Sequence, residues 1–208
     1  MILRPDLVAY ATARTTPPRE ELEALREATA ALPDGQMGTG PIVGRLLELL
    51  IFSAQPRLVV EVGTFTGIAT LFMAAALPAG ARLVTCEIDP ERAAFARSRF
   101  AASPFGPLIE LVEGPALATI GDLDDPVDFA WVDGDKRENV ALYEALVERL
   151  SPHGLLACDN TLRRGDVLDP SDETATAVAA FNDHVAADPR TAQVLLPMSD
   201  GVTLVRRA

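Results

Sequence analysis

The sequence has 208 residues, of which 49% are hydrophobic and 23% charged, a composition typical of one globular domain around a single core. A formal net charge of -12 argues against general nucleic-acid binding, which needs clustered Lys and Arg, and against binding to anionic membranes. The first residues lack a signal peptide's apolar core, and no apolar run approaches the roughly 20 residues that span a bilayer, so we expect a cytoplasmic protein.

The N-terminal quarter of the chain is predicted to be helical. Helical periodicity covers residues 20–32 and 41–54. Between them lies PDGQMGTGP, a Gly-rich segment suited to a loop that closes over a ligand. We therefore interpret residues 1–54 as a cover segment that belongs to a single domain of residues 1–208.

Downstream, short β-branched runs alternate with longer helical stretches, which predicts βαβ units, a parallel sheet and the α/β fold class. The predicted strands are 57–63, 81–89, 107–114, 127–133 and 154–160. The predicted helices are 67–77, 90–102, 136–150 and about 172–187. A Ser-Asp-Gly turn inside residues 192–207 predicts a hairpin, which would add an antiparallel edge strand.

The first predicted strand carries an acid and leads into a glycine-bearing loop. Glu61 falls inside an otherwise apolar run, where a charge is costly unless it meets a ligand, a cation or backbone donors. The alternative is a structural carboxylate that caps local N–H groups. The loop GTFTG, with Gly63 and Gly67, allows the backbone to approach a ligand closely, but it lacks the GxGxxG pattern of dinucleotide sites.

The second predicted strand ends in Glu87, about 20 residues after the glycine loop. From this position a carboxylate accepts hydrogen bonds from the hydroxyls of an adenosine ribose. The loop and the acid together therefore indicate an adenosyl cofactor.

Two further neighbouring strands end in Asp133 and in Asp159-Asn160. Two carboxylates and an amide oxygen side by side suit a hard cation such as Mg²⁺. The alternative is that Asp133 caps the next helix while Asp159-Asn160 forms an Asx turn. Lys136 would lie beside such a cation. The positive charge of the cation disfavours the ammonium form of the lysine, so a neutral amine that accepts a proton is plausible. The alternative is a solvated surface lysine.

At this point the sequence resembles the metal-dependent O-methyltransferases of the catechol and caffeoyl-CoA type. The resemblance runs from about Tyr10 to the C-terminus. It rests on seven segments in family order: QMGTGPIVGRLL, VVEVGTFTG, TCEIDPE, EGPAL, VDGDK, GLLACDNTL and PMSDGVTLVRR.

The resemblance implies a Rossmann-like methyltransferase fold with helices on both faces of a seven-stranded, mostly parallel sheet. The implied strand order is 3-2-1-4-5-7-6, with strand 7 antiparallel. It further implies S-adenosylmethionine as methyl donor, S-adenosylhomocysteine as product, a divalent metal that is expected to be Mg²⁺, and a homodimer.

The resemblance also implies site residues. Asp133 and Lys136 are the expected catalytic residues, with Lys136 as general base, and Asp133, Asp159 and Asn160 the expected metal ligands. The acceptor is expected to meet Lys136, Arg163 and Arg164. The expected cofactor contacts are Met37, Thr39, Glu61, Gly63, Thr64, Phe65, Gly67, Ala69, Glu87, Ile88, Gly114, Ala116, Asp133 and Asp135.

Departures from the family pattern mark where this chain differs. Ala69 replaces a serine whose hydroxyl binds the cofactor carboxylate, and Arg163 replaces an aromatic residue, which suggests a negatively charged acceptor or a gating contact. The plant family's basic residue toward coenzyme A has no clear counterpart before Tyr10, so caffeoyl-CoA is not a safe substrate assignment.

The sequence therefore predicts methyl transfer to a hydroxyl of a small catechol-like or vicinal-diol aromatic acceptor. Two alternatives stay open: an NAD-dependent Rossmann oxidoreductase, and a catalytically silent protein that binds the cofactor or a partner.

Overall fold

Seven strands form one mixed sheet in the order β3-β2-β1-β4-β5-β7-β6 in the computed structural model, which describes residues 4–208. Strands β1 to β5 are parallel, and β7 runs antiparallel to both β5 and β6. The predicted order and the antiparallel hairpin are confirmed. The strands are β1 (Leu58–Val62), β2 (Arg82–Glu87), β3 (Ile109–Glu113), β4 (Val127–Val132), β5 (Leu150–Asp159), β6 (Thr191–Leu196) and β7 (Val202–Arg207).

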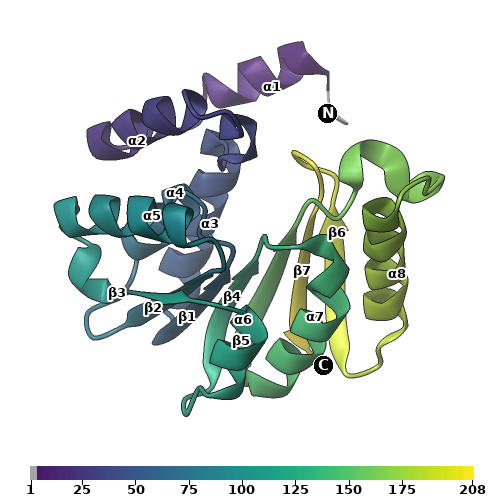
Figure 1. The fold of residues 1–208 in the computed structure, drawn as a ribbon. Coiled ribbons are helices and arrows are strands. Elements are labelled where there is room, and N and C mark those ends of the chain that lie inside the picture. Colours follow the sequence, from purple (N-terminus) through teal and green to yellow (C-terminus); the bar gives the residue numbers. More distant parts are fainter. Residues whose placement is uncertain (1–3) are drawn as a thin grey trace.

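Helices cover both faces of this sheet (Figure 1). One layer holds α3 (Pro41–Ala54), α4 (Ile68–Ala74) and α5 (Pro90–Ala102), and the other holds α6 (Ala116–Gly121), α7 (Asn139–Arg149) and α8 (Glu173–Ala187). Because both faces are covered, β1 is buried along its whole length, as parallel sheets require.

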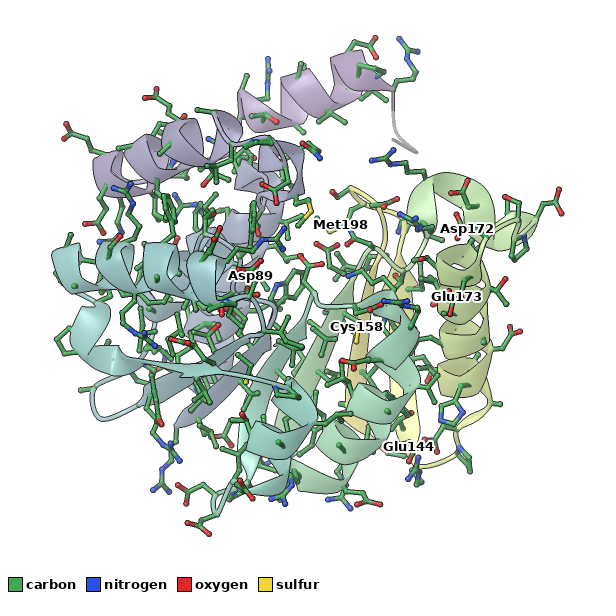
Figure 2. All side chains as sticks on the ribbon, viewed as in Figure 1. Asp89, Glu144, Cys158, Asp172, Glu173 and Met198 are labelled. Atoms are coloured by element: carbon green, nitrogen blue, oxygen red, sulfur yellow. The ribbon has the colours of Figure 1, made fainter. Side chains whose placement is uncertain are left out.

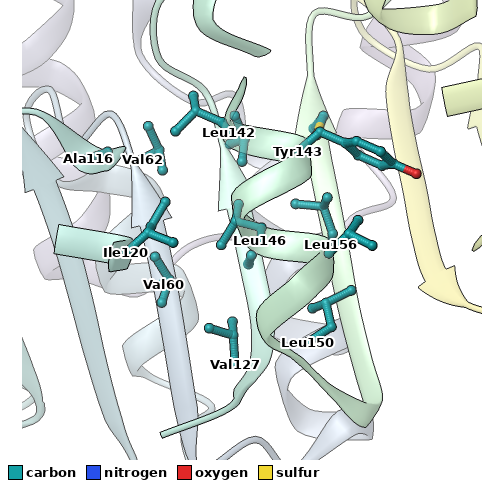
Figure 3. Packing of buried hydrophobic residues seen from close by; sticks show 14 of the residues in the cluster. Val60, Val62, Ala116, Ile120, Val127, Leu142, Tyr143, Leu146, Leu150 and Leu156 are labelled. Atoms are coloured by element: carbon teal, nitrogen blue, oxygen red, sulfur yellow. The ribbon is translucent and has the colours of Figure 1, made fainter. Parts of the chain in front are cut away.

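The apolar core alternates between the two faces of the sheet. Val60 and Val62 pack with Leu142 and Leu146 of α7 (Figure 3), whereas Val59 packs with α3 and α4. Successive side chains of a strand point to opposite faces, so Glu61 shares the face of Val59.

The N-terminal segment contains α1 (Pro5–Thr12), α2 (Glu20–Ala30) and the 3-10 turn η1 (Gly35–Met37). Figure 1 shows α1 and α2 extending across the end of the molecule toward which the parallel strands run. Leu22 and Leu25 of α2 are buried in the cluster formed with α4 and α5. The Thr29 hydroxyl also donates to the Thr66 hydroxyl at 2.9 Å, which ties this segment to the glycine loop.

The expectation that no apolar run approaches the length of a membrane span is wrong for residues 35–54. By length and composition alone, with a mean hydropathy of 1.3, this segment could cross a membrane. Only Pro41–Ala54 is regular α-helix, and that helix buries Val43, Leu47 and Ile51 in the core.

Element boundaries differ from prediction where the signal is short. Strand β5 begins at Leu150 rather than 154, and the six-residue α6 was too short for its periodicity to predict. The predicted helix 136–150 begins as a 3-10 turn, η3 (Lys136–Glu138), followed by α7. The side chain of Asp135 accepts from the Arg137 N–H and caps this turn, so the alternative role of Asp133 as helix cap is wrong.

Candidate functional site

A cavity of about 880 Å³ opens at the carboxyl ends of β1, β2, β4 and β5, where open α/β sheets bind ligands. Its volume lies within the range of small-molecule sites. The predicted site residues that line it are Met37, Thr39, Gly63, Thr64, Phe65, Ala69, Glu87, Ile88, Gly114, Ala116, Asp133, Asp135, Lys136, Asp159, Asn160, Arg163 and Arg164. Glu61 and Gly67 are not among the lining residues, and their predicted contacts with a cofactor stay predictions.

Gly63 allows the loop after β1 to pass close to the end of β4. Its φ of +92° favours glycine, and a Cβ there would lie 2.5 Å from the carbonyl oxygen of Asp133. Gly67 also has a left-handed φ of +88°, and a Cβ there would lie 2.4 Å from the Phe100 ring, so close packing beneath the loop favours glycine as well.

Glu87 lies at the cavity wall with its carboxylate fixed by backbone donors. One oxygen accepts from Phe65 N–H at 2.7 Å, and the other accepts from Asp89 N–H at 3.0 Å. Asp89 also caps α5 through the Glu91 and Arg92 N–H groups, and Figure 2 shows it at the start of that helix. The remaining lone pairs of Glu87 can accept hydrogen bonds from vicinal hydroxyls.

Glu61 lies behind the cavity wall, fully buried between β1, β2 and α4. One carboxyl oxygen accepts from the hydroxyls of Thr70 at 2.5 Å and Thr85 at 2.6 Å. The other oxygen has no partner among residues 4–208. Burial is the largest cause that raises the pKa of Glu61, to about 8, so the side chain is protonated at neutral pH. The observed contacts of Glu61 are therefore closer to the alternative of a structural carboxyl group, although its hydrogen-bond donors are threonine hydroxyls and not backbone N–H groups.

Asp133 and Asp159 leave neighbouring strands side by side, because Val132 of β4 pairs with Cys158 of β5 in parallel register. The Lys136 ammonium donates to Asp133 at 2.7 Å. Burial, and then the negative charge of Asp133, raise the pKa of Asp159 above its usual range, while Lys136 lowers it. The Asp159 carboxylate also accepts the N–H of Asn160, whereas the N–H of Thr161, which an Asx turn would use, donates to the Gly201 carbonyl.

These residues fit a hard divalent cation. Two neighbouring carboxylates have one lysine beside them, which pairs with Asp133, and Asn160 lines the same cavity with a left-handed backbone (φ 58°) that the residue type tolerates. Within residues 4–208, no group of three His, Cys, Asp or Glu side chains could hold a metal. A cation here would therefore need the amide oxygen of Asn160 beside the two carboxylates, with other oxygens completing its shell.

Some cavity residues were not predicted from sequence. Ser199 and Asp200 of the β6–β7 turn line the cavity, because antiparallel β7 begins beside the end of β5, with Val202 paired to Asp159. The predicted hairpin was the sequence signal that could have placed Ser199 and Asp200 in the cavity, because it sets β7 beside β5. Arg92 also lines the cavity and pairs with Asp34 of the cover segment, a contact that no local pattern encodes.

The chain is similar to known O-methyltransferases along nearly its whole length. The profile of a family described as O-methyltransferase matches residues 13–208. A caffeoyl-CoA O-methyltransferase 2 from Zea mays is 34% identical over 97% of this chain and 83% of its own length. The catechol O-methyltransferase domain-containing protein 1 of Mus musculus is 33% identical over 94% of this chain and 77% of its own length.

A solved structure, an O-methyltransferase from Bacillus cereus in complex with S-adenosylhomocysteine, superposes with a TM-score of 0.87. The two sequences are 27% identical, and the match covers 96% of each chain. The observed sheet order is therefore that of a methyltransferase fold.

Protonated Glu61 predicts an unusual pH dependence of stability. Because folding raises the pKa of Glu61, the folded state binds the Glu61 proton more tightly than the unfolded state does. The stabilisation from this proton is complete below about pH 4.5 and is lost as pH rises to about 8. The free energy of unfolding of the ligand-free protein, relative to the Glu61→Gln variant, should fall by up to about 1.4 kcal/mol per pH unit in that window. Urea denaturation from pH 5 to 8.5 measures this difference, and a difference that stays constant or rises would contradict a neutral Glu61.

Proposed function

The chain belongs to the O-methyltransferase family and is an S-adenosylmethionine-dependent enzyme, and we propose that it methylates a vicinal diol on a small aromatic acceptor with divalent-cation assistance. The observation that carries the proposal is the joint placement of Asp133, Lys136 and Asp159 in the cavity that also holds Glu87. With the family shown, neither the oxidoreductase nor the catalytically silent alternative is retained.

We propose that the cavity has a cofactor half and an acceptor half. Glu87 would accept hydrogen bonds from the ribose hydroxyls, and the Gly63 loop would admit the methionine end at close range. Asp133, Asp159 and Asn160 would hold the cation, expected to be Mg²⁺, which polarises a bound hydroxyl and lowers its pKa.

Lys136 is the proposed general base, and it is the only lysine of the chain. All other basic side chains apart from histidine are arginines, whose guanidinium groups stay protonated. Asp133 orients Lys136 Nζ through a 2.7 Å contact. Only the neutral amine can act in this way, so the ammonium beside Asp133 would first release its proton. Nζ would then accept the proton of the acceptor hydroxyl, and the oxygen would take the methyl group while the electrons of the carbon–sulfur bond leave with the cofactor sulfur, in a geometry that the cavity walls hold.

A homodimer is part of the same proposal. Leu49 and Phe52 of α3 are large apolar side chains that are 58% and 68% exposed, and Leu7 and Tyr10 of α1 are also exposed. Such residues favour contact with a second copy. Sedimentation of a species near 22.1 kDa at working concentration would count against it.

Replacing Asp159 with Asn tests the cation. The variant keeps the side-chain shape but removes one of the two carboxylates, so cation-dependent turnover should fall by at least about 100-fold while affinity for S-adenosylhomocysteine persists. Stability should not fall, because the replaced carboxylate is buried and crowded by Asp133. Asp122→Asn, at an exposed site outside the cavity, is the control. Full turnover of Asp159→Asn in the presence of EDTA would refute the cation assignment.

Replacing Lys136 with Arg tests the base. Arginine keeps the positive charge beside Asp133 but cannot accept the proton, so kcat should fall about 10²- to 10⁴-fold. The KM for S-adenosylmethionine should change little. Arg137→Lys, which changes an exposed neighbour that does not line the cavity, should retain activity. Steady-state kinetics decide, and an unchanged kcat in Lys136→Arg would remove this residue as base.

A further inference from the structure

Two arginines lie within four residues of the proposed cation ligands and line the same cavity. Arg163 and Arg164 begin the 3-10 segment η4 (Arg163–Leu168), three and four residues after Asn160. Figure 2 labels Asp172 and Glu173 at the start of α8, and Met198 in the turn between β6 and β7. The acceptor half of the cavity therefore carries strong cations on its rim.

The backbone at these arginines is held in an uncommon conformation. Arg163 and Arg164 have φ values of 45° and 56°, in the left-handed region that non-glycine residues rarely adopt, and Gly165 follows at 97°. Such strain persists where the surroundings enforce it, typically at functional sites.

The β6–β7 turn supplies that enforcement. Leu162 N–H donates to the Asp200 carbonyl at 2.9 Å, and Arg164 N–H donates to the Asp200 carboxylate. Thr161 N–H donates to the Gly201 carbonyl at 3.1 Å. These hydrogen bonds fix the backbone positions from which the two arginine side chains extend.

Both guanidinium groups lack a hydrogen-bonding carboxylate within residues 4–208. The nearest acid to Arg163 is Asp172 at 3.9 Å, beyond hydrogen-bond distance, and the Arg163 Nε atom is buried without a partner. No side-chain partner of Arg164 occurs among the described residues, and its side chain is exposed. An unpaired buried donor is costly, so an acceptor group is expected to reach it.

The other cavity cations are already paired. Lys136 contacts Asp133, and Arg92 contacts Asp34. Among the lining acids, Asp135 pairs with Arg137 and Asp200 receives the Arg164 N–H. Arg163 and Arg164 are therefore the cavity cations without a hydrogen-bonded carboxylate among residues 4–208, while Glu138 and Asp159 also line the cavity and Arg163 lies 3.9 Å from Asp172.

We propose that the acceptor is an anion: an ortho-dihydroxy aromatic acid whose carboxylate pairs with Arg163, while Arg164 adds attraction from the rim. This inference rests on the proposed function. A planar guanidinium matches a carboxylate through two parallel N–H···O bonds, which a neutral ester cannot reproduce. The carboxylate of the cofactor is a second source of the same chemistry, and the experiment separates the two.

The test compares 3,4-dihydroxybenzoate with its methyl ester. Binding of each to the enzyme–S-adenosylhomocysteine complex is measured by calorimetry in the presence of Mg²⁺, and kcat/KM for each is measured with S-adenosylmethionine. The wild type should prefer the acid about tenfold to a hundredfold in both measurements, as expected for a charge-assisted hydrogen bond. In Arg163→Gln the ratio of acid to ester should fall toward one, and Arg163→Lys should retain part of it.

Arg97→Gln is the control, because Arg97 is an exposed arginine paired with Glu113 outside the cavity, and this variant should keep the full preference. Thermal unfolding of each variant separates lost selectivity from lost folding. A wild type that binds and methylates the ester as well as the acid overturns the inference but leaves the proposed function standing. No transfer to either diol, or to other catechols, overturns the proposed function itself. Weaker S-adenosylhomocysteine binding in Arg163→Gln, with the acid preference intact, would assign the arginine to the cofactor and overturn the acceptor assignment.

Discussion

The parallel pairing of β4 with β5 places two carboxylates at one edge of the sheet, and the chemistry of the cavity depends on how their charge is compensated. Val132 and Cys158 are in register, so Asp133 and Asp159 follow as neighbours. Lys136 contacts only Asp133, while burial and repulsion raise the pKa of Asp159. Two crowded carboxylates of this kind are suited to holding a cation, which links the backbone topology to the proposed metal-assisted transfer.

Three acids near this edge differ because their positions in the strands differ. Glu87 is the last residue of β2, and its carboxylate reaches the cavity wall, where backbone N–H groups fix it. Asp159 is the last residue of β5 and opens into the cavity. Glu61 pairs with Thr85 and so lies two residues deeper in the sheet than Glu87, on the same face, where α4 covers it and burial raises its pKa. A difference of two residues in depth along one face therefore separates an acid at the cavity wall from a buried one.

The sequence predicted best what depends on periodicity and strand order. The β-branched runs and the carboxyl-end rule were enough to bring Glu87, Asp133, Asp159 and Asn160 to one cavity. The predicted cofactor contact of Glu61 stays a prediction, because the motif marks a position in the chain but does not encode the burial that places this acid behind the cavity wall. Contacts such as Asp34 with Arg92 join segments 58 residues apart, and tertiary packing alone decides them. The short helix α6 and the left-handed backbone at Arg163 carry no periodic signal.

The two halves of the site are held by different parts of the fold. The proposed cation ligands and the base sit at or just beyond the ends of parallel strands, where a change of backbone would disturb the central sheet. The arginine loop is instead held from the edge, by hydrogen bonds from residues 161–164 to the turn between β6 and β7. Residues in that loop can change without altering the register of β4 and β5. The departure from an aromatic residue at position 163 falls in this separately supported part, so the acceptor can differ between relatives while the chemistry of transfer is kept.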